Sequence, residues 1–285
     1  MGWGQFNLAW TFSEFAGRPV AFFDHTHNIV LQWAVELGIP MAVLLVTLCG
    51  IGVWPVVSTW WRKQDQVATD GQGLQAMAAT VLATAALHSL LEYPLWYAYF
   101  LLPVAFVWGL ALSVSDTETA TTTAAAMPSR LGLLPAGVML VGALWCLADY
   151  QKVASIYAPR EGDPPLAERI ATGRQTLWFS YQADYAWVTD PATGPKLPPA
   201  AFRQTLDNLV DARLMVAYAK SLASHGQVDK ARYVVARLKE FNHPIGQAFL
   251  APCKQATGNP AADDSGLPFQ CSPPKGTYNW RQVLP

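Results

Sequence analysis

Long apolar runs, separated by short polar stretches, occupy the first half of the chain. Four of them are long enough to cross a bilayer, which takes about 20 helical residues at a rise of ~1.5 Å each. These runs cover residues 29–57, 74–91, 95–114 and 131–149. The first contains Glu36 and Pro40, so its fully apolar part begins near Ile39. The pattern predicts a membrane domain over 29–150 with about four transmembrane helices, the second and third joined by a tight turn at 92–94.

The second half has a different pattern, in which apolar and charged positions alternate at helical spacing. Residues 166–190 and 200–240 are rich in helix formers, and 218–241 has the small-residue spacing of a tetratricopeptide-like hairpin with Gly226 at its turn. A single such hairpin cannot bury its own apolar face, so it must pack on neighbouring helices. The expected fold is all-α: polytopic membrane helices followed by a helical, tetratricopeptide-like soluble domain over 151–285.

Composition and charge support this division. The chain is 52% hydrophobic and 14% charged and holds 12 Trp, which is unusual for a soluble protein. Residues 1–150 contain 4 Lys+Arg against 9 Asp+Glu, or −5, whereas 151–285 contain 15 against 11, or +4. The sequence has no Gly-rich phosphate loop, dinucleotide motif or G-x-S-x-G elbow. We expect a lipid bilayer as a partner and no nucleic acid.

Basic residues in the short loops predict the orientation. Arg62 and Lys63 stand at the edge of the loop 60–73, and the loop 115–130 contains Arg130, whereas the turn at 92–94 has no basic residue. Because cytoplasmic loops carry an excess of Lys and Arg, both loops are expected in the cytoplasm. The segment 1–28, the turn and the domain 151–285 are then outside. Arg18 opposes this assignment.

The four cysteines fall into two pairs. Cys49 and Cys146 lie in apolar runs, where thiols behave as small hydrophobic side chains. Cys253 and Cys271 lie in a tail rich in Pro and Gly that has little capacity for a core. In an oxidising periplasm a disulfide between them would stabilise that tail, and the alternative is two unpaired thiols.

Candidate chemistry concentrates in the stretch FDHTHNIVLQW, directly before the first apolar run. It places His25 and His27 beside Asp24 and Asn28. One interpretation is a metal site, for which His88 and Glu92 are the only further donors near the membrane face. A second is a catalytic site, and a third is a polar cap on the membrane helix.

A family resemblance changes the weight of these interpretations. His27-Asn28, nine residues and then Gly38 resemble the H-[NSQ]-x9-G-x-x motif of bacterial O-antigen ligases. The stretches 24–40 and 87–111 resemble more specifically the bacterial O-linked protein oligosaccharyltransferases, the pilin glycosylation ligases. Met41 stands where the ligases usually have Gly, Thr or Tyr, which favours protein glycosylation over lipopolysaccharide ligation. The resemblance covers the C-terminal portion of the family's length, so we expect the chain alone to be inactive.

The resemblance implies transfer of a preassembled glycan from undecaprenyl diphosphate to Ser or Thr hydroxyls of an exported acceptor such as pilin. The reaction would occur at the periplasmic face of the bacterial inner membrane, without a metal or cofactor. The motif assigns catalysis to His27, and imidazole is suited to act as a base near neutral pH. The alternatives are an O-antigen ligase or polymerase, and a non-catalytic membrane scaffold whose tail binds a partner.

Five further residues are expected to contact the substrates. Arg18 is a candidate partner for the diphosphate, Asn28 belongs to the motif, and Gln32 would orient the imidazole. His88 and Glu92, at spacing i, i+4, lie on one face if helical and form either a functional pair or a brace for the turn. The neighbouring aromatic residues are expected to form an interfacial belt: Tyr93, Trp96, Tyr97 and Tyr99.

Overall fold

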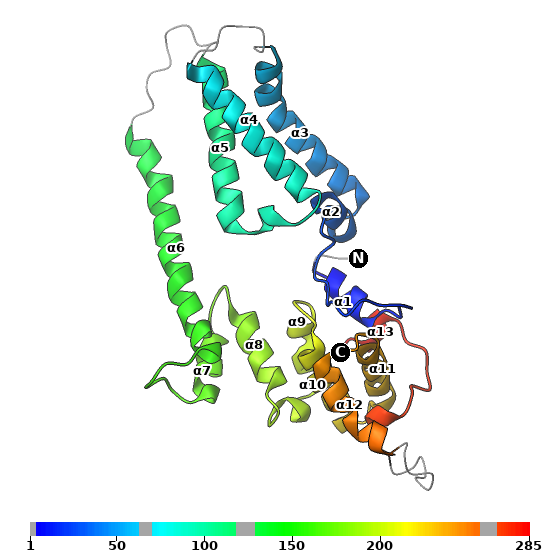
Figure 1. Cartoon of the computed structure of the whole chain (residues 1–285). Helices are drawn as coiled ribbons and strands as arrows, with labels where there is room; N and C mark the ends of the chain where they lie inside the picture. The colour runs from blue at the N-terminus through cyan, green and yellow to red at the C-terminus, as the bar shows by residue number, and fades with distance from the viewer. Residues whose placement is uncertain (1–3, 63–69, 118–128, 257–266) are drawn as a thin grey trace. The chain divides into compact units, whose positions relative to one another are not determined.

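The computed structural model describes residues 4–62, 70–117, 129–256 and 267–285. These residues form helices and connecting segments, with no β-strand in the described ranges (Figure 1). The prediction of an all-α fold is confirmed. The chain divides into two compact units: Met1–Phe6 with His25–Gly132, and Asn7–Asp24 with Leu133–Pro285.

The first unit consists of four helices and one short 3-10 turn. They are α2 (Ile29–Leu37), α3 (Ile39–Arg62), α4 (Asp70–Ser89), η1 (Pro94–Trp96) and α5 (Ala98–Thr117). The predicted apolar run 29–57 is divided at Gly38, whose φ of +87° ends α2. A side chain with a Cβ rarely adopts this backbone conformation, which explains the glycine. The turn expected at 92–94 lies between α4 and η1.

Helices α3, α4 and α5 pack together around a small core of Val56, Ala78, Leu82 and Ala111 (Figure 1). The indole of Trp108 lies against Gly52 and donates a hydrogen bond to its carbonyl oxygen at 3.1 Å. A Cβ at Gly52 would stand 2.5 Å from the Trp108 ring, so only glycine permits this approach.

Most large apolar side chains of the long helices face outward. Two helical segments, Ile39–Ser58 and Leu134–Tyr157, are long and apolar enough to cross a membrane, and Ala98–Leu112 is apolar but shorter. Phe106 on α5 and Val138 on α6 are among the exposed side chains. Exposed apolar surface of this extent indicates contact with lipid or another apolar partner. That 74–91 and 95–114, helical here as α4 and α5, also cross a bilayer stays a prediction.

The second unit contains the remaining helices. They are α1 (Phe6–Phe12), α6 (Ser129–Tyr157), α7 (Leu166–Gly173), α8 (Ser180–Thr189), η2 (Gly194–Lys196), η3 (Pro199–Phe202), α9 (Arg203–Leu206), α10 (Ala212–Ser224), α11 (Val228–Glu240), α12 (Pro244–Ala256), η5 (Phe269–Cys271) and α13 (Trp280–Val283). The regions 166–190 and 200–240 were expected to be helical. The structure divides them into shorter helices with turns between.

Helices α10 and α11 form the hairpin expected from the sequence, with Gly226 at its turn in the left-handed conformation (φ +80°). Asp211 caps the start of α10 by accepting a hydrogen bond from the Leu214 amide at 2.8 Å. The facing sides supply most of the core, including the fully buried Tyr218 and Leu238. The tetratricopeptide-like identity of the hairpin stays a prediction.

Asn7–Asp24 belongs to this second unit and Met1–Phe6 to the first, whereas 1–28 was predicted to be one loop. Leu8 and Phe12 on α1 are fully buried in the core of the second unit. The Asn7 side-chain oxygen accepts a hydrogen bond from the Val210 amide at 2.6 Å, and the Tyr233 hydroxyl donates to the Phe12 carbonyl at 2.7 Å. These apolar positions on one face of a short helix explain why the boundary falls at His25.

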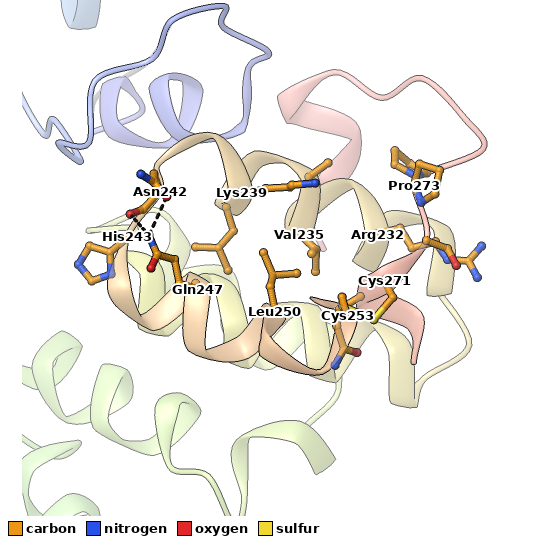
Figure 2. Close-up of a pocket in the computed structure, with 16 residues that line it drawn as sticks. Arg232, Val235, Lys239, Asn242, His243, Gln247, Leu250, Cys253, Cys271 and Pro273 are labelled. Carbon is orange, nitrogen blue, oxygen red and sulfur yellow. Dashed lines mark hydrogen bonds between the residues drawn. A yellow bond between two sulfur atoms is a disulfide. The ribbon is translucent and has the colours of Figure 1, made fainter. Parts of the chain in front are cut away.

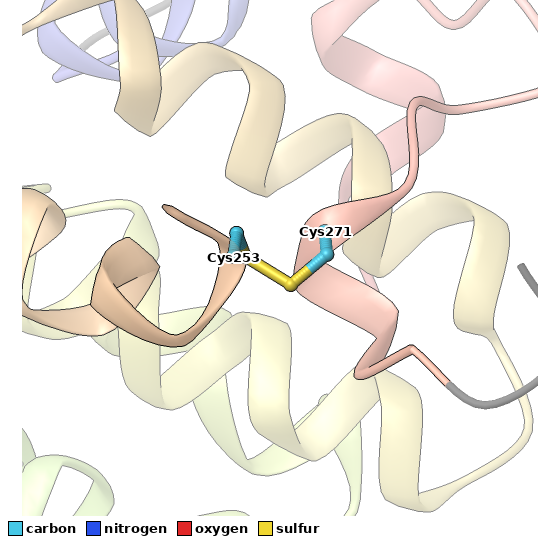
Figure 3. The surroundings of a disulfide bond; sticks show 2 residues. All are labelled: Cys253 and Cys271. Atoms are coloured by element: carbon cyan, nitrogen blue, oxygen red, sulfur yellow. A yellow bond between two sulfur atoms is a disulfide. The ribbon is translucent and has the colours of Figure 1, made fainter. Parts of the chain in front are cut away.

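The last part of the chain is held by covalent and polar contacts. Helix α12, helix α11 and the segment after η5 enclose a groove (Figure 2). Cys253 of α12 and Cys271 of η5 are joined by a disulfide, with an S–S distance of 2.11 Å (Figure 3). Cys49 and Cys146 are free thiols. Tyr218 donates a hydrogen bond to the Val283 carbonyl at 2.6 Å and so attaches α13 to the core.

Candidate functional site

The loop before α2 carries both histidines, and Glu92 reaches them from the connection after α4. His27 Nδ1 lies 2.9 Å from Oε2 of Glu92, and His25 Nε2 lies 4.0 Å from the same oxygen. The side chain of His25 is 17% exposed, whereas those of His27 and Glu92 are 42% and 54% exposed. His25 is therefore sheltered, and the pair of His27 and Glu92 is open to a substrate.

His27 has an unusual backbone conformation. Its φ of +54° lies in the left-handed region, which residues with a Cβ rarely occupy. Such strain costs on the order of 1 to 3 kcal/mol and is frequent at functional sites. The conformation brings the imidazole to Glu92, a residue 65 positions away in the sequence.

The carboxylate of Glu92 determines which nitrogen of His27 carries the proton. The hydrogen bond with His27 lowers the pKa of Glu92 below its ordinary value; partial desolvation opposes this, and the charges of His27, His25 and His88 add to it. An ionised carboxylate only accepts hydrogen bonds, so His27 donates through Nδ1. In the neutral imidazole Nε2 is then an acceptor. The pair can receive a proton at Nε2 while Glu92 stabilises the resulting imidazolium.

Asn28 attaches the histidine loop to two helices. Its side-chain oxygen accepts a hydrogen bond from the Leu31 amide at 3.0 Å, which makes Asn28 the N-cap of α2. Its side-chain nitrogen donates to the carbonyl of Leu90, just after α4, at 2.8 Å. The motif position next to His27 thus holds the loop close to the segment that carries Glu92.

Gln32 also stabilises the histidine loop. Its side chain is almost fully buried, and its oxygen accepts a hydrogen bond from the Thr26 amide at 2.9 Å. Its nitrogen donates to Oε1 of Glu36 at 2.8 Å. Gln32 therefore acts on His27 through the backbone of Thr26. The sequence analysis did not assign Glu36, although its i, i+4 spacing from Gln32 on a helix was an available signal.

Tyr93 is a second residue that the sequence analysis did not assign to the site. It was expected in an interfacial belt, but it is 7% exposed and its ring stacks on His25, with centroids 5.1 Å apart and planes 17° apart. Trp96 also stacks on Tyr93, with ring centroids 5.0 Å apart. The rings of His25 and His27 lie 4.3 Å apart. The stacked rings of Tyr93 and His25 thus lie beside the ring of His27.

His25, His27 and Glu92 together have the composition of a metal site. The donor atoms of His25, His27 and Glu92 lie within 4.8 Å of one another. Two imidazoles and a carboxylate are ligands that suit several divalent transition metals. No metal was expected from the sequence. If these residues do bind a metal, a chelator should stop the activity that depends on them.

The remaining two predicted site residues are His88 and Arg18. His88 is in the last turn of α4, and its backbone carbonyl accepts a hydrogen bond from the Glu92 amide at 2.8 Å. Its ring faces Phe100 at 5.9 Å, in a cavity of about 400 Å³ between α4 and α5 that Tyr99 also lines. His88 therefore contacts Glu92 through its backbone and borders a neighbouring apolar cavity with its ring.

Arg18 is in the second unit, where its side chain is fully buried. Its Nε donates to Oε2 of Glu240 at 3.1 Å, and its terminal nitrogens donate to the carbonyls of Trp10 and Ser13. The guanidinium also lies 4.6 Å from the ring centroid of Phe241. Burial lowers the pKa of Arg18, and the hydrogen bond with Glu240 opposes that shift. Its expected contact with a diphosphate stays a prediction, and it would require these internal contacts to open.

The chain belongs to the family described as virulence factor membrane-bound polymerase, C-terminal, whose sequence profile matches residues 76–252. The matched region includes His88 and Glu92, whereas His25 and His27 precede it. The family supports the membrane association that the apolar helices indicate.

A general O-oligosaccharyltransferase of Acinetobacter baylyi is 25% identical over 245 residues, which are 85% of this chain and 40% of that protein. The chain thus spans less than half the length of this curated relative. No solved structure matches the chain. The resemblance to the O-antigen ligases and O-oligosaccharyltransferases, inferred from the histidine motif and residues 87–111, is confirmed at the level of the family.

Proposed function

We propose that the chain carries the acceptor-activating site of an O-oligosaccharyltransferase. The observation that supports this most is the pairing of His27 with Glu92 at 2.9 Å, in a loop whose backbone is held in a left-handed conformation. The substrates would be a glycan linked to undecaprenyl diphosphate and a Ser or Thr hydroxyl of an exported protein such as pilin. The similarity to the Acinetobacter O-oligosaccharyltransferase supports this substrate class.

In the proposed reaction, the acceptor hydroxyl attacks the anomeric carbon of the glycan. His27 Nε2 takes the hydroxyl proton as the new C–O bond forms, and Glu92 stabilises the imidazolium through Nδ1. The bond between the anomeric carbon and the diphosphate oxygen breaks, and undecaprenyl diphosphate leaves with the bonding electrons. A diphosphate is already a good leaving group, so cations near it would contribute more than a general acid. Arg18 was the candidate from the sequence for such a cation, but its guanidinium is buried and bonded to Glu240 and the carbonyls of Trp10 and Ser13.

A multi-pass topology in the bacterial inner membrane follows from this proposal. The acceptor is exported, so the loop with His27 and the domain 151–285 would face the periplasm. A reporter that is active only in the periplasm is expected to work when fused after Pro285 and to fail when fused at Gly71, because Arg62 and Lys63 favour the cytoplasm. The opposite pattern of reporter activity would place His27 on the wrong side for an exported acceptor.

A glycan polymerase is the second candidate function, and the description of the matching family favours it. The same base would then activate a sugar hydroxyl of a second lipid-linked glycan. The two functions differ in their products: an O-oligosaccharyltransferase yields a glycosylated protein, whereas a polymerase yields longer lipid-linked glycans. Analysis of both products from one reaction distinguishes the two.

Substitution of His27 tests the proposed base. The assay uses a protein in which this chain is joined to the part of the Acinetobacter relative that it does not cover. His27→Ala is expected to reduce transfer by about 10²–10⁴-fold, the usual contribution of a general base. His25→Ala is expected to retain much of the activity because His25 is sheltered and stacked on Tyr93. His225→Ala, an exposed histidine of the second unit outside any proposed site, is the matched control.

Membrane insertion and accumulation of each variant are measured in parallel, so that loss of transfer is not confused with loss of protein. A chelator should leave the wild-type activity unchanged. If His25→Ala and His27→Ala are equally harmful and the chelator also stops transfer, the cluster is a metal site. If neither substitution reduces transfer, the stretch is only a polar cap on a membrane helix and the catalytic assignment of His27 is wrong.

A further inference from the structure

The groove in the second unit has an apolar floor and one cross-linked wall. Val235 and Leu238 of α11 and Leu250 of α12 form the floor, and the volume is about 470 Å³ (Figure 2). The segment after η5, with Pro273 and Pro274, forms the far side. A groove of this size accommodates one or two side chains of a bound polypeptide.

Several contacts keep the groove in shape. The disulfide between Cys253 and Cys271 ties α12 to the segment that closes the groove (Figure 3). At Gly246 an added Cβ would lie 3.1 Å from Leu238, so the two helices approach closely there. The side-chain nitrogen of Gln247 donates a hydrogen bond to the side-chain oxygen of Asn242 at 2.7 Å. The site is therefore largely formed before any ligand binds, which reduces the entropy cost of binding.

The charge on the groove is of one sign. Arg232, Lys239 and His243 line it, and no carboxylate is among its described lining residues. Arg232 Nε is buried and has no hydrogen-bond partner within the described part of the chain. A buried N–H without an acceptor is costly, so a small shift of Arg232 that brings it to an anionic ligand would be favourable.

The two carboxylates on the same helix as these cations already have partners. Asp229 accepts the backbone amides of Lys275 and Gly276 at 2.7 and 2.9 Å. Glu240 pairs with Arg18 and Arg237. Asp229 keeps its negative charge, which also acts on Arg232. Neither Arg232 nor Lys239 forms an ion pair with a carboxylate among the described residues, so both can still bind an anionic ligand.

We propose that this groove binds an extended segment of the acceptor polypeptide, with an apolar side chain on the floor and flanking carboxylates on Arg232 and Lys239. A polypeptide fits better than a small anion because the lining combines an apolar floor with separated cations. The identity of the ligand as the acceptor rests on the proposed function. The binding itself does not, since it requires no glycan transfer.

Direct binding tests the proposal without relying on activity. The full chain in detergent is titrated with a fluorescein-labelled peptide of Asp, Leu, Ser and Gly, and fluorescence anisotropy is measured. Replacing Asp by Lys, or Leu by Ser, in the peptide should abolish binding. Arg232→Gln with Lys239→Gln should weaken it by about tenfold, the effect of losing charge-assisted hydrogen bonds that are partly screened. Arg281→Gln, a cation outside the groove, should leave it unchanged.

Several results would overturn the proposal. They are binding that survives the Arg232 and Lys239 substitutions, binding that inorganic pyrophosphate abolishes completely, and the absence of binding by the folded wild-type chain. If the peptide binds only after Asp263 and Asp264 are replaced by Asn, the groove serves the chain's own segment 257–266. Peptide binding together with a fully active His27→Ala variant would support the groove and refute the proposed catalytic base, so the two failures are distinguishable.

Discussion

The first unit buries four apolar side chains of small or moderate size between α3, α4 and α5, whereas the second buries a much larger cluster around the α10–α11 hairpin. Large apolar side chains of the first unit, such as Phe106, remain exposed. In the second unit Phe12 and Tyr218 are fully buried. The difference indicates that the second unit is stabilised by burial from water, whereas the first unit exposes apolar side chains, as membrane-associated helices do.

Ionisable residues are also used differently in the two units. The second unit buries Arg18 and Arg237, and both form ion pairs with Glu240. Arg237 Nη2 lies 2.9 Å from Glu240 Oε1. The first unit leaves Glu92 and His27 exposed at the end of its helices. A buried ion pair holds a fold in one arrangement, whereas an exposed base can meet a substrate. Burial, not residue type, separates the structural pair from the proposed catalytic pair.

The largest expected difference between the units is in the energetic effect of removing one phenyl ring. Phe12→Ala should lower the free energy of unfolding of the second unit by about 3 to 5 kcal/mol, because it leaves a cavity in a packed core. Phe106→Ala, matched in chemistry but 72% exposed, should change stability little in detergent. Denaturant unfolding of both variants measures this. Equal losses would show that α5 has a packed partner and that the comparison is wrong.

The disulfide should contribute less than the buried core. Reduction of the bond between Cys253 and Cys271, which are 18 residues apart, should destabilise the second unit by about 3 kcal/mol in the entropic model. Thiol labelling of the denatured, unreduced protein should modify only Cys49 and Cys146. Labelling of all four cysteines would show that the bond is absent and that the groove wall is not cross-linked.

The smallest expected effect concerns Asp229 and the C-terminal segment. Hydrogen bonds from the Lys275 and Gly276 amides lower the pKa of Asp229 below its ordinary value, and the Tyr278 hydroxyl adds to this. A lowered pKa in the folded state means that the stabilisation is complete above the unfolded pKa, ~3.9, and is lost as the pH falls through the folded value.

Hydrogen exchange of residues 275–283 should therefore be slow near neutral pH, after correction for the intrinsic rate, and modestly less protected in acid. Asp229→Asn should remove most of this pH dependence, because the amide does not titrate. Asp207→Asn, at an exposed aspartate, is the control. An unchanged pH dependence in Asp229→Asn would assign the attachment of this segment to the core contacts of α13 alone.

The sequence by itself determined the features that depend on local pattern. Apolar runs of sufficient length predicted the long helices, and the spacing around Gly226 predicted the α10–α11 hairpin, because helix periodicity and turn chemistry act over a few residues. The motif of His27, Asn28 and Gly38 identified the histidine loop, whereas the end of α2 at Gly38 came from the structure. These features need no knowledge of what packs against them.

Only the tertiary structure decided the contacts between distant segments. It paired His27 with Glu92 across 65 residues, placed Arg18 on Glu240 across 222, and buried Phe12 beside Tyr233 across 221. The sequence around an imidazole, a guanidinium or a phenyl ring does not indicate which distant residue the group will contact. Which surface covers it depends on how complete helices pack, and that packing is set by the sum of many weak apolar contacts over the whole chain.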